Sequence, residues 1–210
     1  MSQRAWVGTY RIVFALLTLA IIGYQFTTQV QRPGFVPGNF FSLFTIQSNL
    51  IAGSLFLVLA LRQSIPSPAL DLTRGAVAAW MTLMSVVHAL LLSGGPQSIL
   101  QAPDLSVNTM QHKVMPLVVV LDWILRPPRS RIGFARATIW TVYPLMYLGY
   151  TLVRGSRVNW YPYGFLDPGQ DGGYSLMVAV CAVIMVGFLI ASWLLVMIGQ
   201  RLRIHIDPYR

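Results

Sequence analysis

The sequence predicts an all-α integral membrane protein, in which residues 1–210 form one bundle of six transmembrane helices. Composition is the first reason for this prediction. Hydrophobic residues make up 55% of the chain and charged residues 10%, and the mean hydropathy is +0.61. Soluble domains carry about a quarter charged residues, so this balance excludes an ordinary soluble domain.

Six apolar runs are the second reason, because the hydrocarbon core of a bilayer, about 30 Å thick, requires roughly 20 apolar residues in a helix. Charged residues, prolines and glycines bound each run and mark its ends. The predicted spans cover residues 5–29, 40–61, 75–92, 106–125, 134–153 and 174–198. The first run is longer than the apolar region of a signal peptide and lacks a small-residue cleavage pattern, so we expect a retained helix.

The basic residues are the third reason, because they are divided unevenly between the two ends of the predicted spans. Short cytoplasmic loops of membrane proteins hold an excess of Lys and Arg. The loops on one side hold Arg32, Arg154 and Arg157. Eleven of the fifteen basic residues fall on the other side, with both termini: Arg4, Arg11, Arg62, Arg74, Arg126, Arg129, Arg131, Arg136, Arg201, Arg203 and Arg210. We therefore expect both termini to be cytoplasmic.

The net charge of +9 does not indicate a nucleic-acid partner, because the basic residues are scattered among apolar runs and form no continuous basic segment. A single cysteine, Cys181, excludes an intramolecular disulfide and a CxxC metal or redox site. The histidines His88, His112 and His205 lack the spacing of metal ligands, and the chain contains no glutamate. We expect no metal and no other cofactor.

Polar side chains inside the predicted spans are candidate functional groups, because such groups are costly in lipid and usually face the interior of a bundle. In the second span, Thr45, Ser48 and Asn49 share one helix face. In the fourth span, Asn108 and His112 lie one turn apart. Thr45 and His112 each follow the outer start of a span by five or six residues, or roughly 8–9 Å. We therefore expect them at one level.

A threonine hydroxyl beside an imidazole is the minimum for nucleophilic acyl chemistry, in which His112 takes the proton while Thr45 attacks an ester carbonyl. The same residue types also join transmembrane helices by hydrogen bonds without any catalysis. His88 reaches the outer half of the bundle as well, where it orients His112, binds substrate or is a satisfied interior histidine. Asp122 lies about 15 Å deeper than His112, and we expect it to pair with Arg126 or with another arginine of that loop.

The longest predicted outer loop, residues 154–173, reads RGSRVNWYPYGFLDPGQDGG. Its aromatic residues suit the interface between membrane and water, and its prolines and glycines break helix. A structural role is one interpretation. The functional alternative is a lid over a cavity that opens to the outer leaflet, with Asn159 and Asp167 facing a polar ligand. Asp104, also in an outer loop, is a further candidate.

Four segments and one spaced motif carry a resemblance to a known family. The segments are FFSLFTIQSNL, HKVMPLVVVLDW, YPLMYLGYTLVRG and NWYPYGFLD, and the motif is Asn-x-x-x-His-x-x-x-Pro, formed by Asn108, His112 and Pro116. Together they resemble, over nearly the whole chain, the androgen-induced-gene and androgen-dependent TFPI-regulating protein family of integral membrane hydrolases. The resemblance is to the bacterial six-span branch of that family, which implies a bacterial plasma membrane.

The resemblance implies an atypical threonine hydrolase that cleaves fatty acid esters of hydroxy fatty acids without a metal. The family's nucleophile falls on Thr45 and its histidine on His112. The eukaryotic motif has a histidine directly after the asparagine and a threonine directly after the catalytic histidine. This chain has Thr109 and Lys113 at those places, so the resemblance does not determine the lipid substrate.

The leading hypothesis is therefore a lipid esterase with a Thr45 and His112 pair, whose substrate enters from the bilayer. The alternative is a lipid-binding or lipid-transporting bundle that uses the same polar cluster without cleaving a bond. The residues expected to bind substrate or to stabilise the oxyanion are Asn49, Asn108, Lys113, Ser48 and His88.

Overall fold

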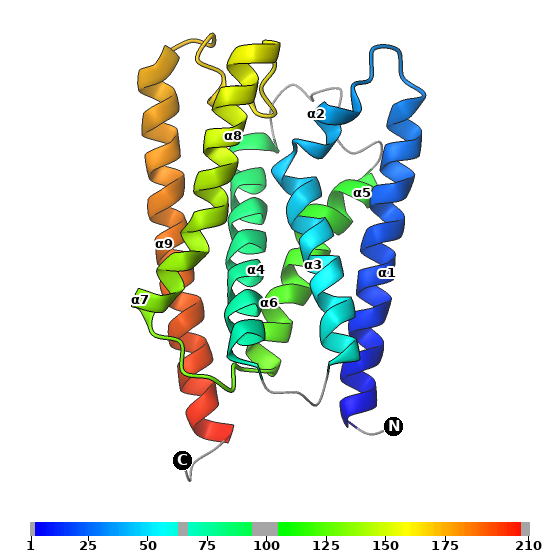
Figure 1. The fold of residues 1–210 in the computed structure, drawn as a ribbon, viewed down its shortest axis with the longest axis vertical. Helices are drawn as coiled ribbons and strands as arrows, with labels where there is room; N and C mark the ends of the chain where they lie inside the picture. Colours follow the sequence, from blue (N-terminus) through cyan, green and yellow to red (C-terminus); the bar gives the residue numbers. More distant parts are fainter. Residues whose placement is uncertain (1–2, 63–66, 94–104, 207–210) are drawn as a thin grey trace.

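The computed structural model describes residues 3–62, 67–93 and 105–206, and these residues form helices and loops without strands. Long helices run side by side along the long axis of the molecule (Figure 1). The candidate residue Asp104 and the side chain of His205 lie outside the described part of the chain.

The first half of the chain contains three long helices and one short helix. They are α1 (Gln3–Val30), α2 (Pro37–Phe41), α3 (Phe44–Leu61) and α4 (Pro68–Val87), the last continued by the π-helical turn η1 (His88–Leu92). In the second half, α5 (Leu105–Thr109), the π-helical turn η2 (Met110–Val114) and α6 (Met115–Leu125) follow one another without a break.

The remaining elements are a second continuous stretch, a short turn and the longest helix. The stretch consists of α7 (Phe134–Ala137), the 3-10 turn η3 (Thr138–Thr141) and α8 (Val142–Val158). The 3-10 turn η4 (Gly164–Leu166) precedes α9 (Gly173–Ile206). The start of α1 and the end of α9 lie at the same end of the bundle (Figure 1).

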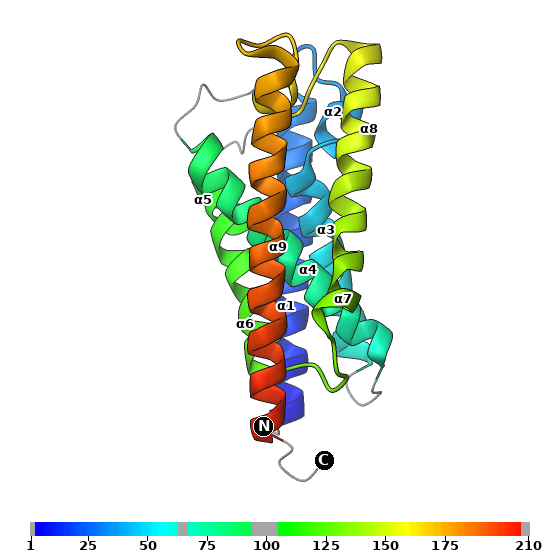
Figure 2. The same ribbon diagram turned by 90° about the vertical axis from the view of Figure 1, so that its left-hand side faces the viewer.

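Four helices in the described part of the chain are long and apolar enough to cross a membrane: Ala5–Val30, Phe44–Leu61, Pro68–Leu92 and Gly173–Arg203. Apolar helices of this length are typical of membrane proteins. The other two predicted spans fall on the interrupted stretches from α5 to α6 and from α7 to α8. Those stretches lie on opposite sides of the bundle (Figure 2).

The predicted start of the second span, at residue 40, is wrong, because the helix is broken at Ser42 and Leu43. The Ser42 hydroxyl donates to the Gly38 carbonyl at 2.5 Å and closes α2, whereas Leu43 is extended, with ψ 127°. Helix α3 therefore begins at Phe44 and carries Thr45 in its first turn.

Three other predicted boundaries also differ from the structure. Helix α4 starts before residue 75, at Pro68, because the Ser67 side chain accepts a hydrogen bond from the Leu70 N–H group and a proline occupies the first position. The stretch from α7 to α8 continues past residue 153 to Val158, and α9 continues past residue 198 to Ile206. The apolar runs therefore predicted the positions of the helices better than their ends.

Helix α4 lies at the centre of the bundle and packs against α3, α6 and α9. Gly75 and its neighbours Ala76, Ala78 and Ala79 are buried on this helix. A Cβ atom on Gly75 would lie 2.3 Å from the Trp140 ring. Small side chains let helices approach closely in membranes, where lipid supplies no hydrophobic driving force between them.

A buried ion-pair cluster joins three helices near the end of the bundle where α1 begins. Asp122 of α6 binds Arg11 of α1, with Nη2 to Oδ1 at 2.8 Å, and Arg74 of α4, with Nη2 to Oδ2 at 2.9 Å. The Tyr10 hydroxyl also donates to Asp122. Arg74 extends the cluster along the chain by donating to the Arg126 carbonyl at 2.6 Å.

The predicted pairing of Asp122 with Arg126 or another arginine of the following loop is therefore wrong. Arg126 contributes its backbone carbonyl, and the cations come from α1 and α4, which are distant in the sequence. The sequence assigned Arg11 and Arg74 to the cytoplasmic side. Both are buried, at 6% and 9% exposure, so their charges are neutralised inside the protein.

The Asp122→Ala variant is expected to unfold at a clearly lower temperature in detergent than the parent protein. Removing one partner of a buried ion pair costs roughly 3–5 kcal/mol, because the remaining charges are left without compensation. Asp171→Ala, which alters an exposed carboxylate, is the matched control. Equal unfolding temperatures for the two variants would contradict a structural role for the cluster.

Candidate functional site

Thr45 and His112 are in contact, although they belong to different helices. Thr45 Oγ1 lies 3.2 Å from His112 Nε2, which is within hydrogen-bond range. Thr45 is 7% exposed and lies in the first turn of α3, where no side chain caps the helix. The common level expected from the sequence is thus observed, although the helix break makes the depth of Thr45 in its own helix smaller than expected.

A backbone carbonyl determines which nitrogen of His112 carries the proton. Nδ1 lies 3.1 Å from the Asn108 carbonyl oxygen. Because a carbonyl can only accept, Nδ1 is the protonated nitrogen and Nε2 presents its lone pair to the Thr45 hydroxyl. This is the tautomer that a general base requires. Asn108 therefore contributes through its backbone, whereas the sequence suggested its side chain.

The ring of His112 stacks on the ring of His88, with centroids 3.8 Å apart and planes inclined by 22°. His88 begins the π-helical turn η1 and His112 lies in the π-helical turn η2. Such turns are frequent at functional sites. Ser85 donates to the His112 carbonyl at 2.7 Å, and the Asn108 side chain interacts with His88. Of the roles considered for His88, the structure supports orienting His112.

Ser48 and Asn49 are buried behind the turn that carries Thr45. The Ser48 hydroxyl and the Asn49 amide both donate to the Thr45 carbonyl, at 3.2 Å and 2.9 Å. The same Asn49 nitrogen lies 3.3 Å from the Gln111 carbonyl. Both side chains therefore donate to backbone carbonyls of α3 and η2. The sequence had predicted that they contact the substrate or the oxyanion.

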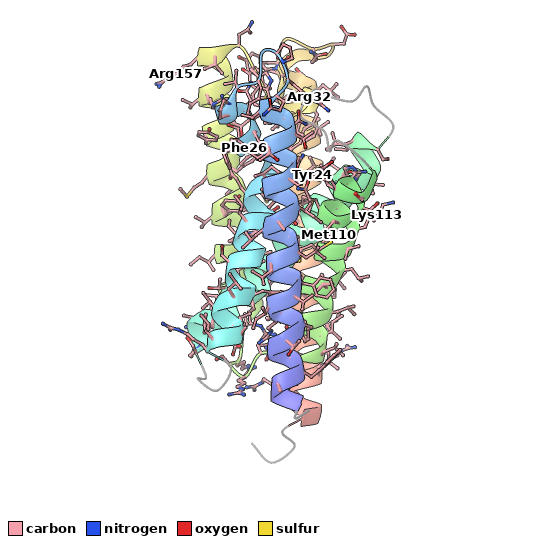
Figure 3. All side chains as sticks on the ribbon, turned by 90° about the vertical axis from the view of Figure 1, so that its right-hand side faces the viewer. Tyr24, Phe26, Arg32, Met110, Lys113 and Arg157 are labelled. Carbon is pink, nitrogen blue, oxygen red and sulfur yellow. The ribbon has the colours of Figure 1, made fainter. Side chains whose placement is uncertain are left out.

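Lys113 does not face the Thr45 hydroxyl. Its side chain is exposed and projects from its helix away from the bundle (Figure 3). The residue is rotated by about 100° from His112 on the helix, so the two side chains diverge. The predicted role of Lys113 as an oxyanion donor is therefore not supported by its position.

A cavity of about 100 Å³ lies between α3, α4, α8 and α9, and Thr45 forms part of its wall. Apolar side chains form most of its wall, among them Met84, Pro144 and Phe188. The polar residues on the wall are Thr45, His88, Tyr147, Tyr163 and Cys181. Ligand sites in proteins commonly combine a mostly apolar wall with a few placed polar groups.

The loop between α8 and α9 lines this cavity with residues other than those expected. Asn159 is exposed and ends α8 in the left-handed conformation, with φ 50°. Asp167 accepts hydrogen bonds from Gly169 and Gln170 of its own loop. Neither lines the cavity, so the structure does not support a contact of these two residues with a ligand there. Tyr163, Phe165 and Leu166 line it instead.

Sequence reasoning missed Tyr163 because an aromatic residue in a loop rich in proline and glycine suggested only the membrane interface. The available signal was a pair of aromatic residues, Tyr163 and Phe165, at alternate positions between prolines. The bundle decides that these side chains point inward.

Within the residues that the structure describes, no three His, Cys, Asp or Glu side chains are grouped to hold a metal ion. Comparison of the chain with protein-family models, with curated proteins and with solved structures finds no match.

The Asn49→Ala variant is expected to unfold at a lower temperature in detergent than the parent protein. The Gln111 carbonyl loses its side-chain donor, and the Thr45 carbonyl loses one of its two side-chain donors. An unpaired buried polar group costs roughly 1–3 kcal/mol. Asn49→Asp, which keeps the shape but cannot donate when ionised, is expected to be at least as unstable. Parent-like stability of Asn49→Asp would show that shape alone matters at this position.

Proposed function

We propose that this chain is an integral membrane lipid esterase in which Thr45 is the nucleophile and His112 the general base. One observation carries the proposal: the Thr45 hydroxyl lies 3.2 Å from an unprotonated imidazole nitrogen, next to an apolar cavity. Structural hydrogen bonds between helices require neither this tautomer nor a cavity at the hydroxyl.

The membrane arrangement that we propose has six spans, with both termini in the cytoplasm of a bacterium and the site in the outer half of the plasma membrane. Four apolar helices and two interrupted helical stretches supply the spans. Arg32 and Arg157 lie at the end opposite to the start of α1 (Figure 3). The end that includes both termini holds the larger share of arginines, which favours the cytoplasmic side.

In the proposed mechanism, His112 Nε2 takes the Thr45 proton while Oγ1 attacks the ester carbonyl. The Asn108 carbonyl stabilises the resulting imidazolium through the N–H group at Nδ1. His112 then returns the proton to the leaving alcohol, and a water molecule hydrolyses the acyl-threonine with the same base.

The proposed substrates are esters with a long acyl chain, which enter sideways from the outer leaflet. The cavity wall is largely apolar and includes the proposed nucleophile Thr45, so the cavity suits apolar carbons of an acyl chain whose ester group lies at Thr45. The resemblance to the androgen-induced-gene family supports fatty acid esters of hydroxy fatty acids as the substrate class.

The Thr45→Ala and His112→Ala variants are expected to lose ester hydrolysis by on the order of 10³-fold or more, because nucleophile and base act as a unit. Thr45→Ser, which retains a hydroxyl, is expected to keep part of the activity. The control is Thr73→Ala, an exposed threonine on α4. Hydrolysis of a long-chain ester by purified, folded protein measures the effect, and parent-like rates in both alanine variants would refute the proposal.

The second candidate is a bundle that binds or transports lipid without cleaving it. The specific observation in its favour is that His112 Nδ1 binds a backbone carbonyl, where most hydrolytic triads have a carboxylate. A fluorophosphonate probe separates the two functions. Labelling that disappears in Thr45→Ala supports the esterase, whereas intact lipid recovered from unlabelled protein supports the carrier.

Occupation of the cavity can be measured through Cys181, the single cysteine, because it lies on the cavity wall. A small thiol reagent is expected to modify Cys181 in detergent, and a long-chain fatty acid is expected to slow this reaction several-fold. A short-chain acid is the control, since it buries too little apolar surface to occupy the cavity to the same extent. Equal protection by both acids would contradict an acyl-binding cavity.

A further inference from the structure

Tyr163 is the polar residue of the outer loop that reaches the nucleophile. It lines the cavity together with Thr45. Its hydroxyl interacts with the Thr45 hydroxyl and with the backbone N–H groups of Phe44 and Thr45, at the start of α3. A side chain of the loop between α8 and α9 is thereby placed beside the atom that would attack an ester.

The loop around Tyr163 is packed, which holds this side chain in place. The Tyr163 ring lies parallel to that of Phe165, with centroids 5.5 Å apart, and the Tyr163 carbonyl accepts a hydrogen bond from the Leu166 N–H group. Tyr161 packs so closely on Gly155 that a Cβ there would lie 2.1 Å from its ring. Contacts of the loop residues before and after Tyr163 thus fix its position.

The groups around the Tyr163 hydroxyl require it to act as a donor. A backbone N–H group can only donate, so the phenol oxygen faces the Phe44 and Thr45 N–H groups as an acceptor. Its own proton is directed to a neighbouring hydroxyl oxygen, that of Thr45 or Tyr147, which also interact with it. Burial raises the pKa of Tyr163, so the phenol is protonated at neutral pH. The Tyr147 hydroxyl donates its single proton to the Ser42 carbonyl at 2.9 Å, so between the two phenols Tyr163 is the donor and Tyr147 the acceptor.

The esterase reaction requires such a donor. Attack by Thr45 Oγ1 places a negative charge on the carbonyl oxygen, one bond from the carbon that Oγ1 joins. The donors expected from the sequence do not meet this need, because Asn49 donates to backbone carbonyls and Lys113 points away. Tyr163 is already next to Oγ1.

We propose that Tyr163 is a catalytic residue whose phenol hydroxyl donates a hydrogen bond to the oxyanion formed when Thr45 attacks the ester. This inference rests on the esterase function proposed above. In the first step the bond from Oγ1 to carbon forms, the carbonyl electron pair moves onto oxygen and His112 takes the threonine proton. The carbonyl then re-forms, the bond to the alcohol oxygen breaks, and that oxygen takes the proton from His112. Tyr163 keeps its proton throughout.

The test is the Tyr163→Phe variant, which removes one hydroxyl and retains the ring that packs on Phe165. Loss of one oxyanion donor lowers kcat by about 10²–10³-fold, and KM is expected to change little. The rate of labelling by a fluorophosphonate is expected to fall with kcat, because the phosphonyl oxygen occupies the place of the oxyanion. Tyr161→Phe, in the same loop but outside the cavity wall, is expected to behave as the parent does.

A second variant separates hydrogen-bond donation from packing. Replacement of Tyr163 by 3,5-difluorotyrosine retains the hydroxyl and makes the phenol more acidic, so the loss of kcat at alkaline pH is expected to begin at a lower pH. An unshifted profile, or a Tyr163→Phe variant with parent-like kcat and altered KM, would overturn the inference and leave the esterase function standing. Absence of Thr45-dependent hydrolysis in the parent protein would overturn both.

Discussion

Polar groups inside an apolar bundle must find their partners within the protein, because hydrocarbon offers none. This constraint explains the buried cluster in which Asp122 binds Arg11 and Arg74. The cluster joins α1, α4 and α6, and the α4 helix that it holds packs against α3 and α9 as well. One carboxylate therefore fixes α4 and α6 relative to one another, and the helical stretches to which these two helices belong carry His88 and His112.

The same constraint acts at the other end of α4 with a different result. The polar groups there are uncharged side chains and backbone carbonyls, and each buried donor selects a nearby acceptor. The Asn108 carbonyl accepts a hydrogen bond from His112 Nδ1–H, and the Thr45 carbonyl accepts hydrogen bonds from Asn49 and Ser48. The Thr45 hydroxyl and the His112 Nε2 lone pair are left facing one another beside a cavity. The hydrogen bonds that hold these helices together thereby also create a reactive arrangement.

Sequence reasoning reached the Thr45 and His112 contact by a route that was partly incorrect. It assumed one helix from residue 40, whereas the Ser42 hydroxyl ends α2 and a new helix starts at Phe44. The pairing was still found, because the polar residues of two apolar runs converge on the interior whatever their exact depth. Lys113, Asn159 and Asp167 lie away from the Thr45 hydroxyl for the opposite reason: each can satisfy its polar group at the surface or within a loop.

The sequence by itself determined the all-helical, membrane-type character of the chain and the identity of the two central polar side chains. Apolar runs and rare intramembrane polar groups are local properties, so they can be read along the chain. The tertiary structure decided the partners of Asp122, the protonated nitrogen of His112, the cavity and the inward position of Tyr163. Each of these depends on atoms brought together from distant helices, and no spacing along the chain encodes such a contact.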